Sequence, residues 1–285
     1  MDYVVFSAGF LALFFASVTD FRSREVPDLL SYGFLSFSIA YGLLKAWVLG
    51  SWQPVLAMLS GLVVFGGLGL LLLYGGQWGG ADMKLLAALG ALFGLWVGQY
   101  DALLFLVLLL FTGAAYGIVY TLALAAAHRE AFVSALREQL VLPRVRWARR
   151  ITLAACFLIL LLVFIVRTTP LLLFAVLLYL FFWLWVTVRV VENELLTKEY
   201  AVAQLTEGDW VTHDVVVHGK TVYKKSELGV TKKDIAALRR AKVKRVMVKE
   251  GIPFVPSFLA AFILLWFVKP VLVSLLMRLA TIVGG

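Results

Sequence analysis

The sequence is short of the residues that build disulfides and zinc sites. Its single cysteine, Cys156, lies inside an apolar run and has no second cysteine to pair with. One cysteine cannot supply a Cys₄ zinc site, and the H-E-x-x-H motif of zinc proteases does not occur. We therefore expect no metal site and no cofactor, and we interpret Cys156 as a small packing residue.

Histidine is almost as scarce, and its positions exclude a further kind of chemistry. The three histidines are His128, His213 and His218, and all of them lie outside the apolar runs. A Ser–His dyad within the membrane fits this sequence badly, because its serine would lack a histidine base.

Charge is also in short supply. Charged residues make up 15% of the 285-residue chain and hydrophobic residues 62%, whereas a soluble domain is about a quarter charged and about half apolar. Several apolar runs have about 20 residues, which is enough to cross about 30 Å of hydrocarbon. The composition predicts a multi-pass protein of the cell membrane, in contact with lipid.

The apolar runs predict an all-α polytopic membrane protein with about eight transmembrane helices. The first run has no basic segment before it and no small-residue cleavage site after it, so we expect a retained span and not a signal peptide. The fourth run is short and contains glycine. The expected spans are 3–19, 29–49, 54–75, 83–98, 101–127, 151–167, 170–190 and 256–281.

The basic residues predict the orientation of these spans. Of the 26 lysines and arginines, 22 lie in the segments 20–28, 76–84, 128–150 and 189–255, which an eight-span topology places on one side. Positive charge marks the cytoplasmic side, so both termini are expected outside. This placement accounts for the net charge of +9, and we expect no nucleic-acid partner. No feature of the sequence indicates an oligomeric state.

One segment departs from the membrane pattern. Residues 192–255 contain short alternating stretches typical of strands, with a turn expected at His218-Gly219. Thr231 with Asp234 three residues later predicts a helix start. We expect a small cytoplasmic α+β domain here. The remaining organisation is a membrane core over 1–127, a basic cytoplasmic loop over 128–150, two spans within 151–191 and a last span within 256–285.

Two aspartates stand at expected helix ends. Asp20 ends the first span, and Asp82 precedes the fourth span in the glycine-rich stretch GGQWGGADMK. If antiparallel spans bring the two together, they would share a proton, because two adjacent carboxylates cannot both ionise cheaply. One could then activate water while the other polarises a peptide carbonyl, as in an aspartic protease. Isolated acids at the membrane edge are the alternative interpretation.

The helix dipoles suggest where the shared proton lies. Asp20 sits at the end of a helix, where negative charge is disfavoured, and Asp82 at the beginning of one, where it is favoured. This predicts that Asp20 carries the proton and that Asp82 is ionised. The glycines before Asp82 would let a substrate backbone approach closely.

These stretches resemble a known family. TDFRSREVPD, residues 19–28, is similar to the first-span motif of type IV prepilin peptidases and archaeal preflagellin peptidases. In that motif an aspartate is followed by a hydrophobic residue, proline, and Asn or Asp. GGADMK, residues 79–84, resembles the second motif of these GxGD-type membrane aspartic proteases, with Ala81 in place of the second glycine, as in the looser archaeal form. The resemblance covers about residues 1–100.

The resemblance implies an activity and the residues that perform it. Asp20 and Asp82 would be the catalytic pair of an endopeptidase that removes basic leader (class III signal) peptides from pilin-like or archaellin-like precursors at the cytoplasmic membrane face. Bacterial members carry a cysteine-based zinc site and N-methyltransferase activity, which a single cysteine cannot support. Secondary candidates for substrate binding are Gly79, Gly80, Pro27, Asp28 and Lys84, although Asp28 could instead cap the second span and Lys84 could be solvated.

Two other classes of function stay open. A transporter or channel could use Asp20 and Asp82 as ion or proton sites, although the chain has no clear internal repeat and both acids lie at the membrane edge. A non-enzymatic scaffold built around the domain over 192–255 would tolerate the loss of either aspartate.

Overall fold

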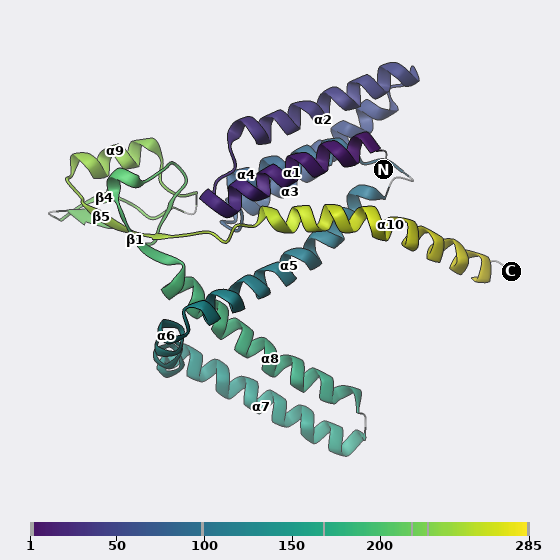
Figure 1. Ribbon diagram of the computed structural model, residues 1–285. Coiled ribbons are helices and arrows are strands. Elements are labelled where there is room, and N and C mark those ends of the chain that lie inside the picture. Colours follow the sequence, from purple (N-terminus) through teal and green to yellow (C-terminus); the bar gives the residue numbers. More distant parts are fainter. Residues whose placement is uncertain (1–2, 98–99, 168, 218, 227, 284–285) are drawn as a thin grey trace. The chain divides into compact units, whose positions relative to one another are not determined.

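The computed structural model describes residues 3–97, 100–167, 169–217, 219–226 and 228–283. Most of these residues are helical, and a small region of short strands lies between α8 and α10 in the chain (Figure 1). The chain divides into two compact units. The first contains residues 1–117 and 251–285, and the second contains residues 118–250.

Helices from both ends of the chain build the first unit. They are α1 (Tyr3–Ser23), α2 (Asp28–Leu49), α3 (Gln53–Tyr74), α4 (Gly80–Phe93), the first part of α5 (Asp101–Ala127) and α10 (Val255–Val283). α1 packs against α10, and α4 packs against α2 and α3. The last helix of the chain therefore belongs with the first ones, although the second unit separates them in sequence.

α4 lies at the centre of this unit. Residues 85–92 of α4 are all buried. Gly61 of α3 and Gly90 of α4 allow the two backbones to touch, because a Cβ added at Gly61 would overlap the Gly90 carbonyl oxygen. The largest fully buried side chains of the surrounding core are Leu13, Phe65, Leu85, Leu86, Leu89, Phe105, Phe258, Phe262 and Leu265.

Among the residues that the structure describes, six helices are long and apolar enough to cross a membrane. They are α1, α2, α3, α5, α7 (Pro143–Val166) and α8 (Pro170–Val190) together with the π-helical turn that follows it to Leu195. α4 has 14 residues, which span only about 21 Å at 1.5 Å per residue. α10 contributes a shorter apolar helix over Val255–Val271. The chain is thus a multi-pass membrane protein, and its described residues contain six candidate spans by length and composition, so the expected count of eight stays a prediction.

After the last part of α5, the second unit is helical where the sequence favours a basic loop. Residues 128–150 contain α6 (Arg129–Val141) and the first turns of α7. Ala135 of α6 and Val145 of α7 are buried against Phe182 and Val186 of α8, and Phe132 and Leu136 pack on the same cluster. The apolar residues of α6 thus follow helical spacing, but the surrounding arginines obscure that pattern in the sequence.

The strands of the second unit form a small α+β region, as predicted. β1 (Thr197–Ala201), β5 (Arg245–Lys249) and β2 (Trp210–Val211) make an antiparallel sheet in the order β1-β5-β2, and β3 (Val215–Val217) pairs with β4 (Lys220–Tyr223). Within the β3–β4 turn, Gly219 has a φ of +76°, and His218 lies outside the described residues. Leu238 of α9 (Lys232–Arg240) packs against Val246 and Val248 of β5.

The predicted start of α9 is confirmed. The Asp234 N–H donates to Thr231 Oγ1 at 3.2 Å, and the Thr231 N–H donates to Asp234 Oδ2 at 2.9 Å. This reciprocal pair satisfies two main-chain donors at the helix end. We call residues 196–250, from the residue before β1 to the residue after β5, the sheet domain.

Candidate active site at the ends of α1, α4 and α10

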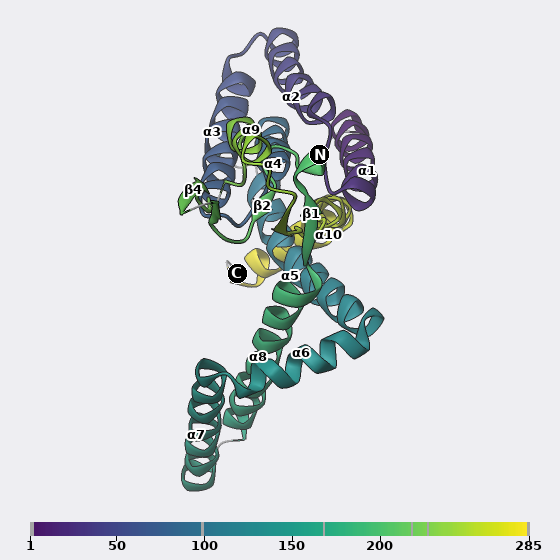
Figure 2. The same ribbon diagram turned by 90° about the vertical axis from the view of Figure 1, so that its left-hand side faces the viewer.

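Asp20 lies inside α1 and not after it. The helix continues to Ser23, so Asp20 occupies its last turns and is 7% exposed. Asp20 Oδ2 accepts a hydrogen bond of 2.9 Å from the main-chain N–H of Val255, the first residue of α10. Both ribbon views show the beginning of α10 beside the end of α1 (Figures 1 and 2). A residue 235 positions away in sequence therefore holds one oxygen of this carboxylate.

The sequence around Val255 explains this contact. The first N–H groups of a helix have no partner within the helix and must find an acceptor elsewhere. Pro256 has no N–H to offer, and the Ser257 N–H bonds to the Phe254 carbonyl at 3.0 Å. The Val255 N–H is thus the donor that the start of α10 presents to a buried acceptor, and Asp20 supplies that acceptor.

Asp82 lies in the first turn of α4. It is partly buried, and its Oδ2 accepts a 3.1 Å hydrogen bond from the Gly79 N–H. Gly79 is the N-cap residue of α4, so the carboxylate folds back over the glycine-rich turn. The space beside Gly80 is open, since a Cβ there would meet no atom within 4 Å, and Gly76 takes a φ of +64° that suits glycine.

The two aspartates lie close enough to act on each other. Burial, and then the negative charge of Asp20, raise the pKa of Asp82 to about 7, while the Gly79 N–H opposes this rise. A position at a helix start would by itself favour ionised Asp82, but desolvation outweighs that effect. The prediction that Asp20 carries the proton and Asp82 is ionised considered only the dipoles of α1 and α4. It did not include α10, whose first N–H donates to Asp20.

Two secondary candidates bind each other. Lys84 Nζ lies 2.5 Å from Asp28 Oδ1 and 4.4 Å from the centre of the Tyr32 ring. The Lys84 side chain is 19% exposed, so the interpretation of Lys84 as a solvated lysine is wrong. Asp28 does not cap α2 either, because Pro27 occupies the N-cap position and Asp28 is the first helical residue. This pair joins α2 to α4, one turn away from the glycine-rich segment.

The comparisons with known proteins concern the part of the chain that carries both aspartates. Residues 7–122 match the type IV leader peptidase family. Preflagellin peptidase of Methanococcus voltae is 29% identical over 89 residues, which are 31% of this chain and 38% of the relative. Preflagellin peptidase of Methanococcus maripaludis strain C6 is 34% identical over 92 residues, 32% of this chain and 38% of the relative.

These matches leave most of the chain uncovered. The chain spans less than two fifths of the length of the curated relatives that it matches. No solved structure matches the chain. Asp20 and Asp82 both fall within the leader peptidase segment, whereas Val255 lies 133 positions beyond its last residue, 122.

Sequence reasoning about the leader peptidase segment missed the aromatic residues next to the pair. Trp78, directly before Gly79, packs against Phe254 and Phe258 with ring centroids 5.5 and 5.4 Å apart. These rings hold the glycine-rich turn against the start of α10. The stretch IPFVPSF contains both phenylalanines and two prolines. It lies within KEGIPFVPSFLAAF, residues 249–262, which is similar to archaeal preflagellin peptidases, but that similarity does not indicate that it packs beside Asp20 and Asp82.

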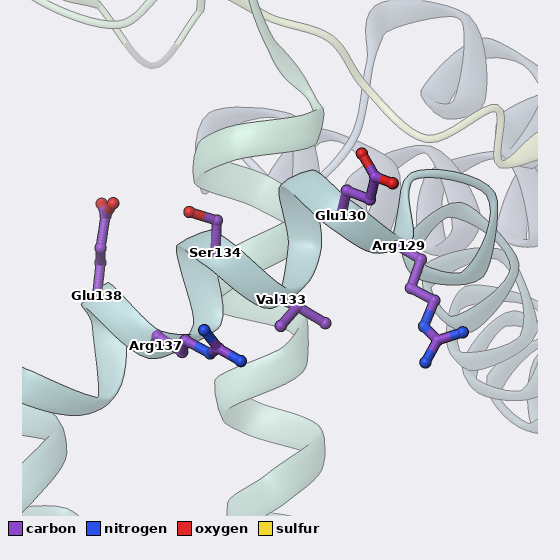
Figure 3. Close-up of a pocket in the computed structure, with 6 residues that line it drawn as sticks. All are labelled: Arg129, Glu130, Val133, Ser134, Arg137 and Glu138. Atoms are coloured by element: carbon purple, nitrogen blue, oxygen red, sulfur yellow. The ribbon is translucent and has the colours of Figure 1, made fainter.

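A surface hollow elsewhere contains neither aspartate. It lies along α6 and is lined by Arg129, Glu130, Val133, Ser134, Arg137 and Glu138. Figure 3 shows Glu130, Ser134 and Glu138 on one side of this helix and Arg129, Val133 and Arg137 on the other. All six residues come from a single helix, so this hollow is the exposed face of α6 and offers no converging groups for catalysis.

Proposed function

We propose that this protein is a membrane aspartic endopeptidase that removes N-terminal leader peptides from pilin-like or archaellin-like precursors. One observation carries the proposal: the negative charge of Asp20 raises the pKa of Asp82, 62 positions away in sequence, and both acids lie within the segment that matches the leader peptidase family. The two Methanococcus relatives are preflagellin peptidases, which agrees with this activity.

The proposed mechanism divides two roles between the carboxyl groups. Asp82, with a pKa of about 7, holds a proton in mildly acidic to neutral solution and donates a hydrogen bond to the scissile carbonyl. Asp20 acts as the base that takes a proton from the attacking water. Its Oδ2 is occupied by the Val255 N–H, so Oδ1 is the oxygen assigned to the water. No covalent intermediate and no cofactor are needed.

The proposed substrate enters from the cytoplasmic side. The excess of lysine and arginine in the segments that flank the spans supports placing Asp20 and Asp82 at the cytoplasmic face with both termini outside. The apolar helix of a precursor would lie in the bilayer, and its basic leader would reach the two acids. The open space at Gly80 supports close approach of a substrate main chain. We propose no methyltransferase activity, since the chain has one cysteine.

The proposal is tested by cleavage in membranes. Wild type, Asp20→Asn and Asp82→Asn are compared on a panel of precursors with class III leaders, and Glu130→Gln on the exposed face of α6 serves as a matched acid-to-amide control. We expect a loss of about a thousandfold or more in both aspartate variants and none in the control. Cleavage that survives either aspartate change would refute the pair, and ion flux would then be measured to test the transporter alternative.

A further inference from the structure

Asp20 receives its hydrogen bond from the main chain of a segment that lies far outside the family match. We propose that residues 251–255, the strap that leads into α10, position the Asp20 carboxylate, with the Val255 N–H as the positioning group. This inference rests on the proposed function, because it concerns the geometry of the same catalytic pair. It adds the C-terminal part of the chain to a site that is otherwise built from α1 and α4.

The contact at the membrane end of the strap is buried and specific. The Val255 N–H donates to Asp20 Oδ2 at 2.9 Å, and Val255 is 1% exposed. Ser257 bonds back to the Phe254 carbonyl through both its N–H, at 3.0 Å, and its hydroxyl, at 2.7 Å. The first turn of α10 is therefore closed by its own groups, and Val255 directs its N–H at the aspartate.

Neighbouring elements hold this donor in place. The Phe254 ring packs on Trp78 and fills the space beside Gly113 of α5, where an added Cβ would lie 2.8 Å from Phe254 Cζ. Thr112 Oγ1 donates to the Ser257 carbonyl at 3.1 Å. A donor fixed from two sides restricts its acceptor, so one oxygen of Asp20 has a defined position.

The other end of the strap is anchored as well. Arg24, four residues after Asp20, donates from Nη1 to the Gly251 carbonyl at 3.1 Å. Arg24, Gly251, Val255 and Asp20 all belong to the first unit, so this contact holds the strap within the same unit as the aspartate.

The first experiment removes the N–H without changing the charge. Val255→Pro deletes the donor at a helix position where proline is tolerated, and Val255→Ala shortens the side chain but keeps the donor. In the membrane cleavage assay we expect Val255→Pro to lower kcat by about 10- to 100-fold with little change in KM. The acidic limb of its pH–rate profile should move to higher pH, because the ionised carboxylate loses a donor. Equal behaviour of the two variants would overturn the proposal.

A second experiment reads the contact without any substrate. With ¹³C-carbonyl phenylalanine and ¹⁵N-valine, only Phe-Val pairs give a combined signal, and the chain has three, at Val133, Val255 and Val268. The Val255 resonance should change with pH in wild type and not in Asp20→Asn, while Val133 and Val268 report on α6 and α10. An unchanged Val268 signal in Val255→Pro shows that α10 is intact.

The two readouts separate the possible failures. A Val255 resonance that does not depend on Asp20 would overturn the positioning role, whether or not the protein cleaves a precursor. A resonance that depends on Asp20, in a protein that cleaves no leader-bearing precursor, would support the contact and count against the proposed function alone.

Discussion

Asp82→Asn should make the protein more stable while it abolishes cleavage. The pKa of Asp82 is about 7 in the folded protein and about 4 in an unfolded chain. The folded state therefore binds this proton more tightly, so the stabilisation is fully present below about pH 4 and is lost as pH rises to about 7. Three pKa units correspond to about 4 kcal/mol. This value is the largest loss of folding stability that ionisation of Asp82 can cause.

Asparagine mimics the protonated acid and can still accept from the Gly79 N–H. We expect Asp82→Asn to raise the free energy of unfolding at pH 8 by up to about 4 kcal/mol and to leave it nearly unchanged at pH 4. The assay is thermal unfolding in detergent at both pH values. Asp28→Asn is the matched control: its carboxylate is 74% exposed, so losing its pair with Lys84 should cost about 1 kcal/mol or less.

The sign of the stability change at pH 8 decides whether Asp82 lies in a desolvated site beside Asp20. If Asp82→Asn is no more stable than wild type at pH 8, or gains as much at pH 4 as at pH 8, the carboxylate is not held in a desolvated site beside Asp20. Combined with Asp20→Asn, the gain from Asp82→Asn should become smaller, because the neighbouring negative charge is already removed.

Three further predictions concern contacts around the site. Arg24→Met should slow leader cleavage by about 3- to 10-fold in initial-rate measurements, because it releases the Gly251 carbonyl, whereas Arg22→Met removes the same charge from the same helix end and should leave the rate unchanged. Gly61→Ala should lower the free energy of unfolding by about 3 kcal/mol or more, as its Cβ would overlap the Gly90 carbonyl; Gly67→Ala on the same helix meets no atom within 4 Å and should be neutral or slightly stabilising. Lys269 Nζ lies 2.6 Å from Asp101 Oδ1, so Lys269→Met and Asp101→Asn should each lower the free energy of unfolding by about 1–3 kcal/mol. The double variant should lose less than the sum of the two, which a double-mutant cycle of thermal unfolding would measure.

Local and compositional features of this protein were predictable from its sequence. Long apolar runs imply membrane helices, because about 20 apolar residues in a row are long enough to cross the bilayer. The resemblance to leader peptidases follows from the residues next to Asp20 and Asp82. The cap of α9 was equally predictable, because Thr231 and Asp234 interact across three residues. α6 was missed where arginines hid its apolar spacing. The shortness of α4 became evident only from its ends at Gly80 and Phe93.

The tertiary structure decided how the site is completed. The donor to Asp20 is a main-chain N–H, which nearly every residue possesses, so no residue type in the sequence marks it. Val255 reaches Asp20 because α10 packs against α1 after an inserted unit of 133 residues. That packing depends on many apolar contacts between distant segments. The sequence thus determined which two acids to consider, and long-range packing determined what holds Asp20 and what raises the pKa of Asp82 to about 7.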